Sequence, residues 1–290
     1  MNALSQLFGR SSSRAASLRI DKTFNLIPAK SLHVSKPIDW LESRFHFNFA
    51  GYWDENKQNF GVLRVLNDDL VTPRGGFPTH PHRDMEIISY VVQGGLTHKD
   101  SMGTQETLGR GSVQYMSAGT GVRHSEFNAS DSETLRFLQL WISPNQHGLK
   151  PNYGSKIFKP EDRLNRVLHL VSGNHEKHPD TIAIYQDANI FVSEIEEGKT
   201  VTFNLEEGRQ AYLVCVEGDL DINGKAQLAA KDAVEMTGPS ELVFTNLNRQ
   251  SGVKAHFLMV EMEEAVSNTE IPTPNLSNNV LYVKDEITRS

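Results

Sequence analysis

Hydrophobic residues along the chain gather in short runs that end at glycine, proline or asparagine. In the first half, runs rich in β-branched and aromatic residues occupy 87–92, 97–99, 113–116 and 135–142, and turn residues such as Gly94-Gly95 and Pro144 follow them. In the second half, similar runs occupy 190–192, 201–203, 212–216, 220–222, 241–245 and 256–260. Short, evenly spaced strands with turn signals between them are typical of β-sandwiches and barrels.

This pattern predicts an all-β protein with two β-barrel modules in tandem. Asn223-Gly224, directly after the run 220–222, is a strong signal for a β-hairpin. We expect an N-terminal extension over 1–20, a first barrel over 21–150 and a second barrel over 181–265. Residues 151–180 are expected to connect the barrels, with a short helix, and residues 266–290 to form a C-terminal tail.

Composition narrows the class of protein. A chain of 290 residues has room for two domains, and its net charge of -7, without a Lys/Arg cluster, argues against direct binding to nucleic acid. Apolar runs are too short to cross a bilayer, so we expect no membrane association. The single cysteine, Cys215, excludes an internal disulfide and is expected to be a buried apolar residue.

The first twenty residues differ from the rest. They carry Arg10, Arg14 and Arg19, many serines and no acidic residue. An amphipathic, Arg-rich and acid-poor segment is typical of a mitochondrial presequence, but an N-terminal extension without a targeting role has the same composition. The expected location is therefore the cytoplasm or nucleus, or the mitochondrion if the segment is a presequence.

Candidate chemistry lies in two compact patterns of the first module. The pair His80 and His82, and the pair His124 and Glu126, each have a two-residue spacing. In a strand this spacing places both side chains on one face, so the four groups converge if the strands face the same interior. Three neutral imidazoles and one carboxylate suit iron, manganese, copper, nickel or zinc, and no thiolate is needed.

Spacing alone leaves the carboxylate ligand open. Glu86 lies four residues after His82 and can face the same interior as Glu126. Whichever carboxylate does not bind the metal is expected to hold a hydrogen bond or salt bridge, because unpartnered buried carboxylates are rare. His98 has no companion in a similar pattern, so it is expected to be an ordinary polar residue of its strand.

Longer motifs around these residues resemble those of the pirin family of bicupins. They are 77–86 (FPTHPHRDME), 98–103 (HKDSMG) and 116–128 (MSAGTGVRHSEFN), with 64–69 (RVLNDD) and 141–144 (WISP) in support. The resemblance covers about 20–260 and is strongest in the first half. It implies two cupin barrels (jelly rolls, or double-stranded β-helices), of which only the first holds a metal. The implied ligands are His80, His82, His124 and Glu126, the implied metal is most often Fe(II), and a monomer is the default.

The resemblance also implies a function. Several pirins open a flavonol such as quercetin with O2 and release carbon monoxide, which would make Glu126 both a ligand and the base that takes the proton of the flavonol hydroxyl. Other pirins are nuclear proteins that bind transcription regulators and respond to the oxidation state of iron, a non-enzymatic alternative in which the metal is a switch. A scaffold that uses the barrel only for its shape is the third possibility.

Overall fold

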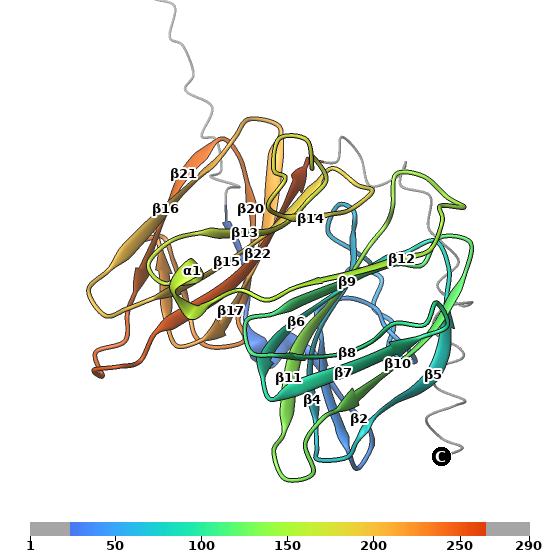
Figure 1. Ribbon diagram of the computed structural model, residues 1–290. Helices are drawn as coiled ribbons and strands as arrows, with labels where there is room; N and C mark the ends of the chain where they lie inside the picture. The colour runs from blue at the N-terminus through green and yellow to red at the C-terminus, as the bar shows by residue number, and fades with distance from the viewer. Residues whose placement is uncertain (1–23, 265–290) are drawn as a thin grey trace, which may run out of the picture.

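The computed structural model describes residues 24–264 and consists of two β-sandwiches side by side, each with a seven-stranded and a four-stranded sheet (Figure 1). The large sheet of the first barrel has the order β12 (Asn152–Lys156), β9 (Val113–Ser117), β6 (Glu86–Gln93), β11 (Leu135–Ile142), β4 (Leu63–Val71), β3 (Leu41–Phe45) and β2 (His33–Ile38). Its small sheet has the order β5 (Gly76–His82), β10 (Val122–Asn128), β7 (Gly95–Asp100) and β8 (Gln105–Gly109). This is the all-β, two-barrel architecture expected from the sequence.

The second barrel repeats the arrangement. Its large sheet has the order β1 (Phe24–Ile27), β20 (Ala233–Thr237), β17 (Arg209–Glu217), β22 (Ala255–Glu263), β15 (Ala188–Ile195), β13 (Leu168–Ser172) and β14 (Ile182–Ala183). The small sheet has the order β16 (Thr200–Leu205), β21 (Ser240–Asn246), β18 (Leu220–Ile222) and β19 (Ala226–Leu228). The predicted hairpin joins β18 to β19, where Asn223 and Gly224 both adopt positive φ angles of 58° and 65°.

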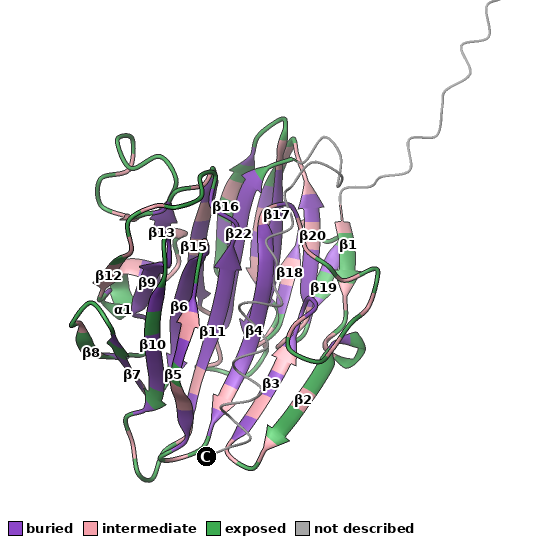
Figure 2. Cartoon of the chain, turned by 90° about the vertical axis from the view of Figure 1, so that its right-hand side faces the viewer, coloured by how far each residue is buried: buried purple, intermediate pink, exposed green. Residues whose placement is uncertain are grey.

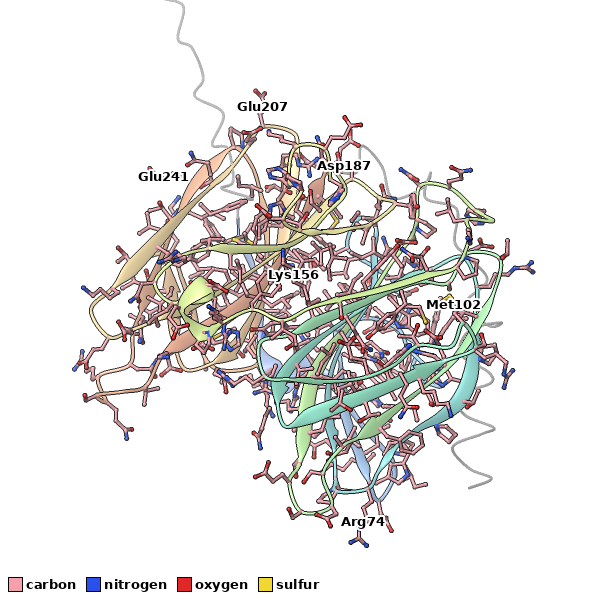
Figure 3. The ribbon with its side chains drawn as sticks, in the orientation of Figure 1. Arg74, Met102, Lys156, Asp187, Glu207 and Glu241 are labelled. Carbon is pink, nitrogen blue, oxygen red and sulfur yellow. The ribbon has the colours of Figure 1, made fainter. Side chains whose placement is uncertain are left out.

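The two large sheets pack face to face, which explains why their strands are apolar without alternation. Each central strand buries one side against its own barrel interior and the other side against the opposite barrel. In β6, seven of the eight residues are buried, and strands β11, β4, β17 and β22 of the two large sheets are also buried along most of their length (Figure 2). Charged residues at the surface, such as Arg74, Glu207 and Glu241, point outwards (Figure 3).

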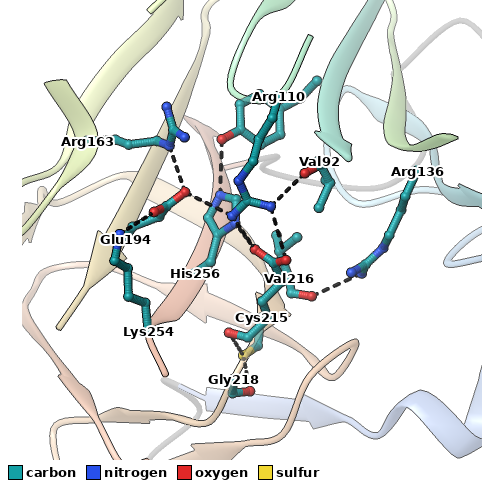
Figure 4. A network of polar contacts seen from close by, with 12 residues as sticks. Val92, Arg110, Arg136, Arg163, Glu194, Cys215, Val216, Gly218, Lys254 and His256 are labelled. Carbon is teal, nitrogen blue, oxygen red and sulfur yellow. Dashed lines mark hydrogen bonds and ion pairs between the residues drawn. The ribbon is translucent and has the colours of Figure 1, made fainter. Parts of the chain in front are cut away.

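A layer of charged and polar contacts also joins the barrels (Figure 4). Arg110 of the first barrel donates to Glu217 at 2.6 Å and to Glu194 at 3.0 Å, both in the second barrel. Glu194 also accepts from the buried Arg163 at 2.9 Å. The Tyr90 hydroxyl lies 3.1 Å from Nε2 of His256. The interface therefore combines a continuous apolar core with buried ion pairs.

Two connections differ in detail from the sequence-based division. Strand β1 precedes the first barrel in the chain but pairs with β20 at the edge of the second barrel. The segment expected to connect the barrels contains the short helix α1 (Pro160–Arg163), but β12 on one side of it extends the first large sheet and β13 on the other side belongs to the second. The N-terminal extension and the C-terminal tail lie outside the described residues. Within 24–264, no helix is long and apolar enough to span a membrane.

The two barrel interiors differ in a way that positions the site. One apolar cluster, which includes Leu213, Phe244 and Phe257, fills the second barrel. The interior of the first barrel instead holds two separate apolar clusters, one around Trp141 and one around Phe137. Polar side chains occupy the space between them, and the candidate ligands lie in this polar layer.

Candidate metal centre

The small sheet of the first barrel carries all the predicted ligands on its inner face. His80 and His82 on β5 are buried while Pro81 between them is partly exposed, as the two-residue period requires. His124 and Glu126 lie on the neighbouring strand β10, where His124 is directly opposite His80. Their positions follow from strand parity and from the antiparallel pairing of β5 with β10.

A β-bulge in β5 lies directly before the pair His80 and His82. Between the partners His124–His80 and Glu126–Phe77, strand β5 contains one residue more than β10. Pro78 lies in this bulge, where its missing N–H costs no ladder hydrogen bond. Its carbonyl oxygen accepts a hydrogen bond of 2.7 Å from Nδ1 of His80. With the proton held on Nδ1, the Nε2 atom of His80 carries the lone pair that a metal needs.

The spacing of the imidazoles suits a metal ion. Nε2 of His80 and Nε2 of His124 are 3.0 Å apart. Two adjacent ligands at bond lengths of about 2.1 Å and a right angle have a separation of about 3.0 Å. Candidate ligand atoms of His80, His82 and His124 all lie within 4.8 Å of one another. Burial, followed by the neighbouring imidazoles, lowers the pKa of His82 and His124 well below 6.5, which keeps both rings neutral and able to bind a cation.

Glu126, two residues after His124 on β10, offers a carboxylate oxygen within 4.8 Å of ligand atoms of His98 and His124. Only 1% of Glu126 is exposed, and within 24–264 no lysine or arginine pairs with it. Its carboxylate accepts hydrogen bonds from three neutral side chains of the large sheet: Ser89 at 3.1 Å, Gln114 at 2.6 Å and Gln139 at 2.7 Å. Burial raises the pKa of Glu126 above 4.5, although the neighbouring His98 and these hydrogen bonds oppose the shift. A bound cation would supply the missing counter-charge.

His98 also lies in the cluster, although the sequence pattern set it apart. Ligand atoms of His98, His124 and Glu126 lie within 4.8 Å of one another, so His124 belongs to two overlapping sets. His98 is fully buried on β7, its Nε2 lies 3.0 Å from Asp100, and its ring stacks on Tyr153. The two-residue spacing of His98 and Asp100 is the sequence signal that could have identified His98 as part of the cluster. Nδ1 of His98 is buried without a hydrogen-bond partner, as is Nδ1 of both His82 and His124.

The structure separates Glu86 from this cluster. Its carboxylate accepts hydrogen bonds from the Tyr115 hydroxyl at 2.8 Å, from Ser117 at 2.7 Å and from the backbone N–H of Tyr185 at 3.2 Å. Tyr185 belongs to the second half of the chain, so Glu86 is a contact between the barrels. The hydrogen bonds expected of the carboxylate away from the metal site are therefore present at Glu86.

A cavity of about 580 Å³ leads from the surface to the cluster. His80 and Glu126 form part of its wall, together with Gln139. The rest of the lining includes six large aromatic side chains: Phe45, Phe49, Tyr52, Trp53, Phe77 and Trp141. The rings of His33 and Tyr52 stack at its edge with centroids 4.2 Å apart. The volume and the apolar lining suit a flat aromatic molecule of drug-like size.

The polar partners of Glu126 were not predicted from the sequence, although the sequence contains a signal for them. Gln114, Ser89 and Gln139 each interrupt an apolar run, and the registers Ser89–Gln139 and Ser89–Gln114 place them side by side across β9, β6 and β11. A polar residue inside a strand that is buried on both faces needs a buried partner. Within 24–264, both groups with metal-binding geometry lie in the first barrel.

Comparisons with known proteins agree with the geometry. Residues 28–142 match the family model described as Pirin, and 170–262 match the model of a quercetinase C-terminal cupin domain. The chain is 41% identical to a pirin-like protein of Caulobacter vibrioides over 72% of its own length and 88% of that protein. It is 37% identical to quercetin 2,3-dioxygenase of Escherichia coli over 64% of this chain and 78% of that protein. The crystal structure of the bacterial pirin YhhW of Escherichia coli with nickel(II) is 29% identical, covers 83% of this chain and 100% of its own, and has a TM-score of 0.74.

Proposed function

The chain belongs to the pirin family, and from this premise we propose that it is a metal-dependent dioxygenase that opens a flavonol such as quercetin with O2 and releases carbon monoxide. The main support for this proposal is that His80 and Glu126 belong to the buried cluster and also line the aromatic cavity. A substrate in that cavity would lie directly against the donor set. The relative named quercetin 2,3-dioxygenase supports the choice of a flavonol.

The residues fit a divalent ion bound by His80, His82, His124 and Glu126, and Fe(II) is the ion we propose. Manganese, copper, nickel and zinc suit the same ligands, and nickel is bound by the related YhhW. Such an ion would supply a positive centre that favours the ionised form of a bound phenol or enol.

Glu126 is the group that we propose takes the proton of the flavonol 3-hydroxyl. Its carboxylate belongs to the cavity wall, so it would lie next to a hydroxyl group of a bound substrate. Gln114 and Gln139 hold the carboxylate by amide N–H groups, so its oxygens remain directed at the cluster. The aromatic wall excludes water and holds the flavonol rings flat, which limits side reactions of the opened ring.

The direct test is carbon monoxide release from quercetin under oxygen, with purified protein reconstituted with Fe(II). His124→Ala is the control that removes one proposed ligand, and metal content is measured in both proteins. Release that requires both Fe(II) and His124 is the expected result. Absence of release from protein shown to hold iron would overturn the dioxygenase and favour an iron-dependent regulatory protein.

A further inference from the structure

A second polar group lines the same cavity, beside the partners of Glu126. Asn67 and Asp69 alternate along β4, and Ser43 on β3 is directly opposite Asp69. All three line the cavity, although their exposed fractions are only 1%, 2% and 2%. Polar side chains on an inner sheet face with so little exposure need partners within the barrel or in a bound ligand.

The hydrogen bonds of this polar group are incomplete within the described residues. The Ser43 hydroxyl donates a hydrogen bond to Oδ1 of Asp69, and Asp69 makes no other hydrogen bond among the described residues. Oδ1 of Asn67 is buried and has no hydrogen-bond partner within the described part of the chain. Burial, reinforced by the charges of Asp68 and Glu126, raises the pKa of Asp69 to about 8, so this carboxyl group is also suited to donate a hydrogen bond. Within the described residues, one acceptor, Oδ1 of Asn67, and one possible donor, the carboxyl group of Asp69, therefore lack hydrogen-bond partners in the cavity wall.

The position of the group relative to the candidate ligands is fixed by the sheet. Asn67 is paired with Gln139, which donates to Glu126, and Ser43 lies one strand further out. Neighbouring strands are about 4.8 Å apart, so the group is one to two strand spacings from the contact with Glu126. Aromatic side chains such as Phe45 and Trp141 line the space on the way. This separation matches a hydroxyl group on another ring of a flat multi-ring molecule.

We propose that Asn67, Asp69 and Ser43 form a subsite that binds a second hydroxyl group of the substrate, one that does not react. The inference rests on the proposed function and makes it narrower: the substrate is a polyhydroxylated flat aromatic compound, with hydroxyl groups at both ends of the ring system. A site built to hydrogen-bond a hydroxyl group rejects an analogue without it, because its own buried polar groups are then left unpaired.

The test compares quercetin with 3-hydroxyflavone, which keeps the reacting hydroxyl group and has no other. Dissociation constants are measured without oxygen on the iron-loaded protein, and kcat/KM is measured with oxygen. The variants are Asp69→Leu, Asn67→Leu and Ser43→Ala, with Asp69→Asn as the conservative change. Ser193→Ala, at a buried serine of the second barrel, is the control for loss of a buried hydroxyl elsewhere.

The unaltered protein should bind quercetin at least about tenfold more tightly than 3-hydroxyflavone. Asp69→Leu and Asn67→Leu should remove most of this preference through weaker binding of quercetin, with 3-hydroxyflavone nearly unchanged, and Asp69→Asn should retain part of it. An unchanged preference, or equal losses for both flavonols, would overturn the subsite. Binding without oxygen is independent of turnover, so a preference that the variants abolish in a protein without turnover would sustain the subsite and reject the dioxygenase.

Discussion

Nε2 of Gln139 donates a hydrogen bond of 2.7 Å to Oε2 of Glu126, across the interior of the first barrel from one sheet to the other. Gln114 donates to the other carboxylate oxygen from the same large sheet. A carboxylate held at both oxygens cannot rotate away from the three imidazoles. The large sheet therefore orients a ligand that the small sheet carries.

Gln139→Leu removes one of these two supports and leaves every proposed ligand in place. We expect metal affinity to fall by about 10- to 100-fold, as for other residues that orient metal ligands. The measurement is a competition titration of the reconstituted protein with a chelator of known affinity. Unchanged affinity would show that Gln139 does not position Glu126, and Gln114→Leu would then test the other support.

Glu126→Gln and Glu86→Gln form a matched pair, because both residues are buried carboxylates of the first barrel with neutral hydrogen-bond donors. Glu126→Gln should lose both tight metal binding and turnover, since an amide is a poor ligand and a poor base. Glu86→Gln should retain metal and turnover, since within 24–264 the Glu86 carboxylate accepts hydrogen bonds only from Tyr115, Ser117 and Tyr185. Metal content per chain and carbon monoxide release would decide, and metal loss in Glu86→Gln alone would reverse the assignment.

His124→Ala and His98→Ala test the ligand set itself. His124 is common to both groups of candidate ligand atoms, so its loss should weaken metal binding by more than about a hundredfold. Nε2 of His98 is already engaged by Asp100, and we expect His98→Ala to lose no more than about tenfold. Equal losses in the two variants would make His98 a fifth ligand or a replacement for one of the four.

Glu194→Gln tests the ion pairs between the barrels. Burial alone would raise the pKa of Glu194, but the hydrogen bond from Arg163, with the charges of His256, Arg163 and Arg110, lowers it to about 2 from 4.5. A depressed pKa in the folded state stabilises the protein above pH 4.5, and this contribution is lost as the pH falls towards 2.

At pH 7 the free energy of unfolding of Glu194→Gln should therefore be lower by about 3 kcal/mol, because the substitution leaves the buried Arg163 unpaired. Urea unfolding at pH 7, 4 and 3 should show the difference from the unaltered protein shrinking as the pH falls. A difference that does not change with pH would mean that the charge of Glu194 contributes little.

Local patterns in the sequence predicted most of the strands and the faces of the key side chains. The spacing of His80 and His82, and of His124 and Glu126, was enough because strand parity is a local property. The contacts of Glu126 with Gln114 and Gln139 were not predictable in this way. They join two different sheets, and no local period records which residues face each other across a barrel.

The choice between Glu86 and Glu126 shows the same limit. Glu126 faces the interior of the first barrel, where Ser89 of β6 donates to it, whereas Glu86, three residues before Ser89 on β6, faces the second barrel and Tyr185. The parity of His82 does not carry over to Glu86, because the turn between β5 and β6, with Asp84 at a φ angle of 47°, separates the two residues. Family resemblance, not spacing, favoured Glu126 in the sequence.

Strand β1 has a consequence for how the molecule is made. Asn25 on β1 contacts Glu235 across 210 positions of chain, and the strand completes the edge of a sheet whose other members come from the C-terminal half. During synthesis on the ribosome, β1 is made early but cannot pair until β20, near the end of the described chain, has been synthesised. Cutting the gene between the two barrels would therefore yield one fragment with an unpaired strand and another with an open sheet edge, which is prone to self-association.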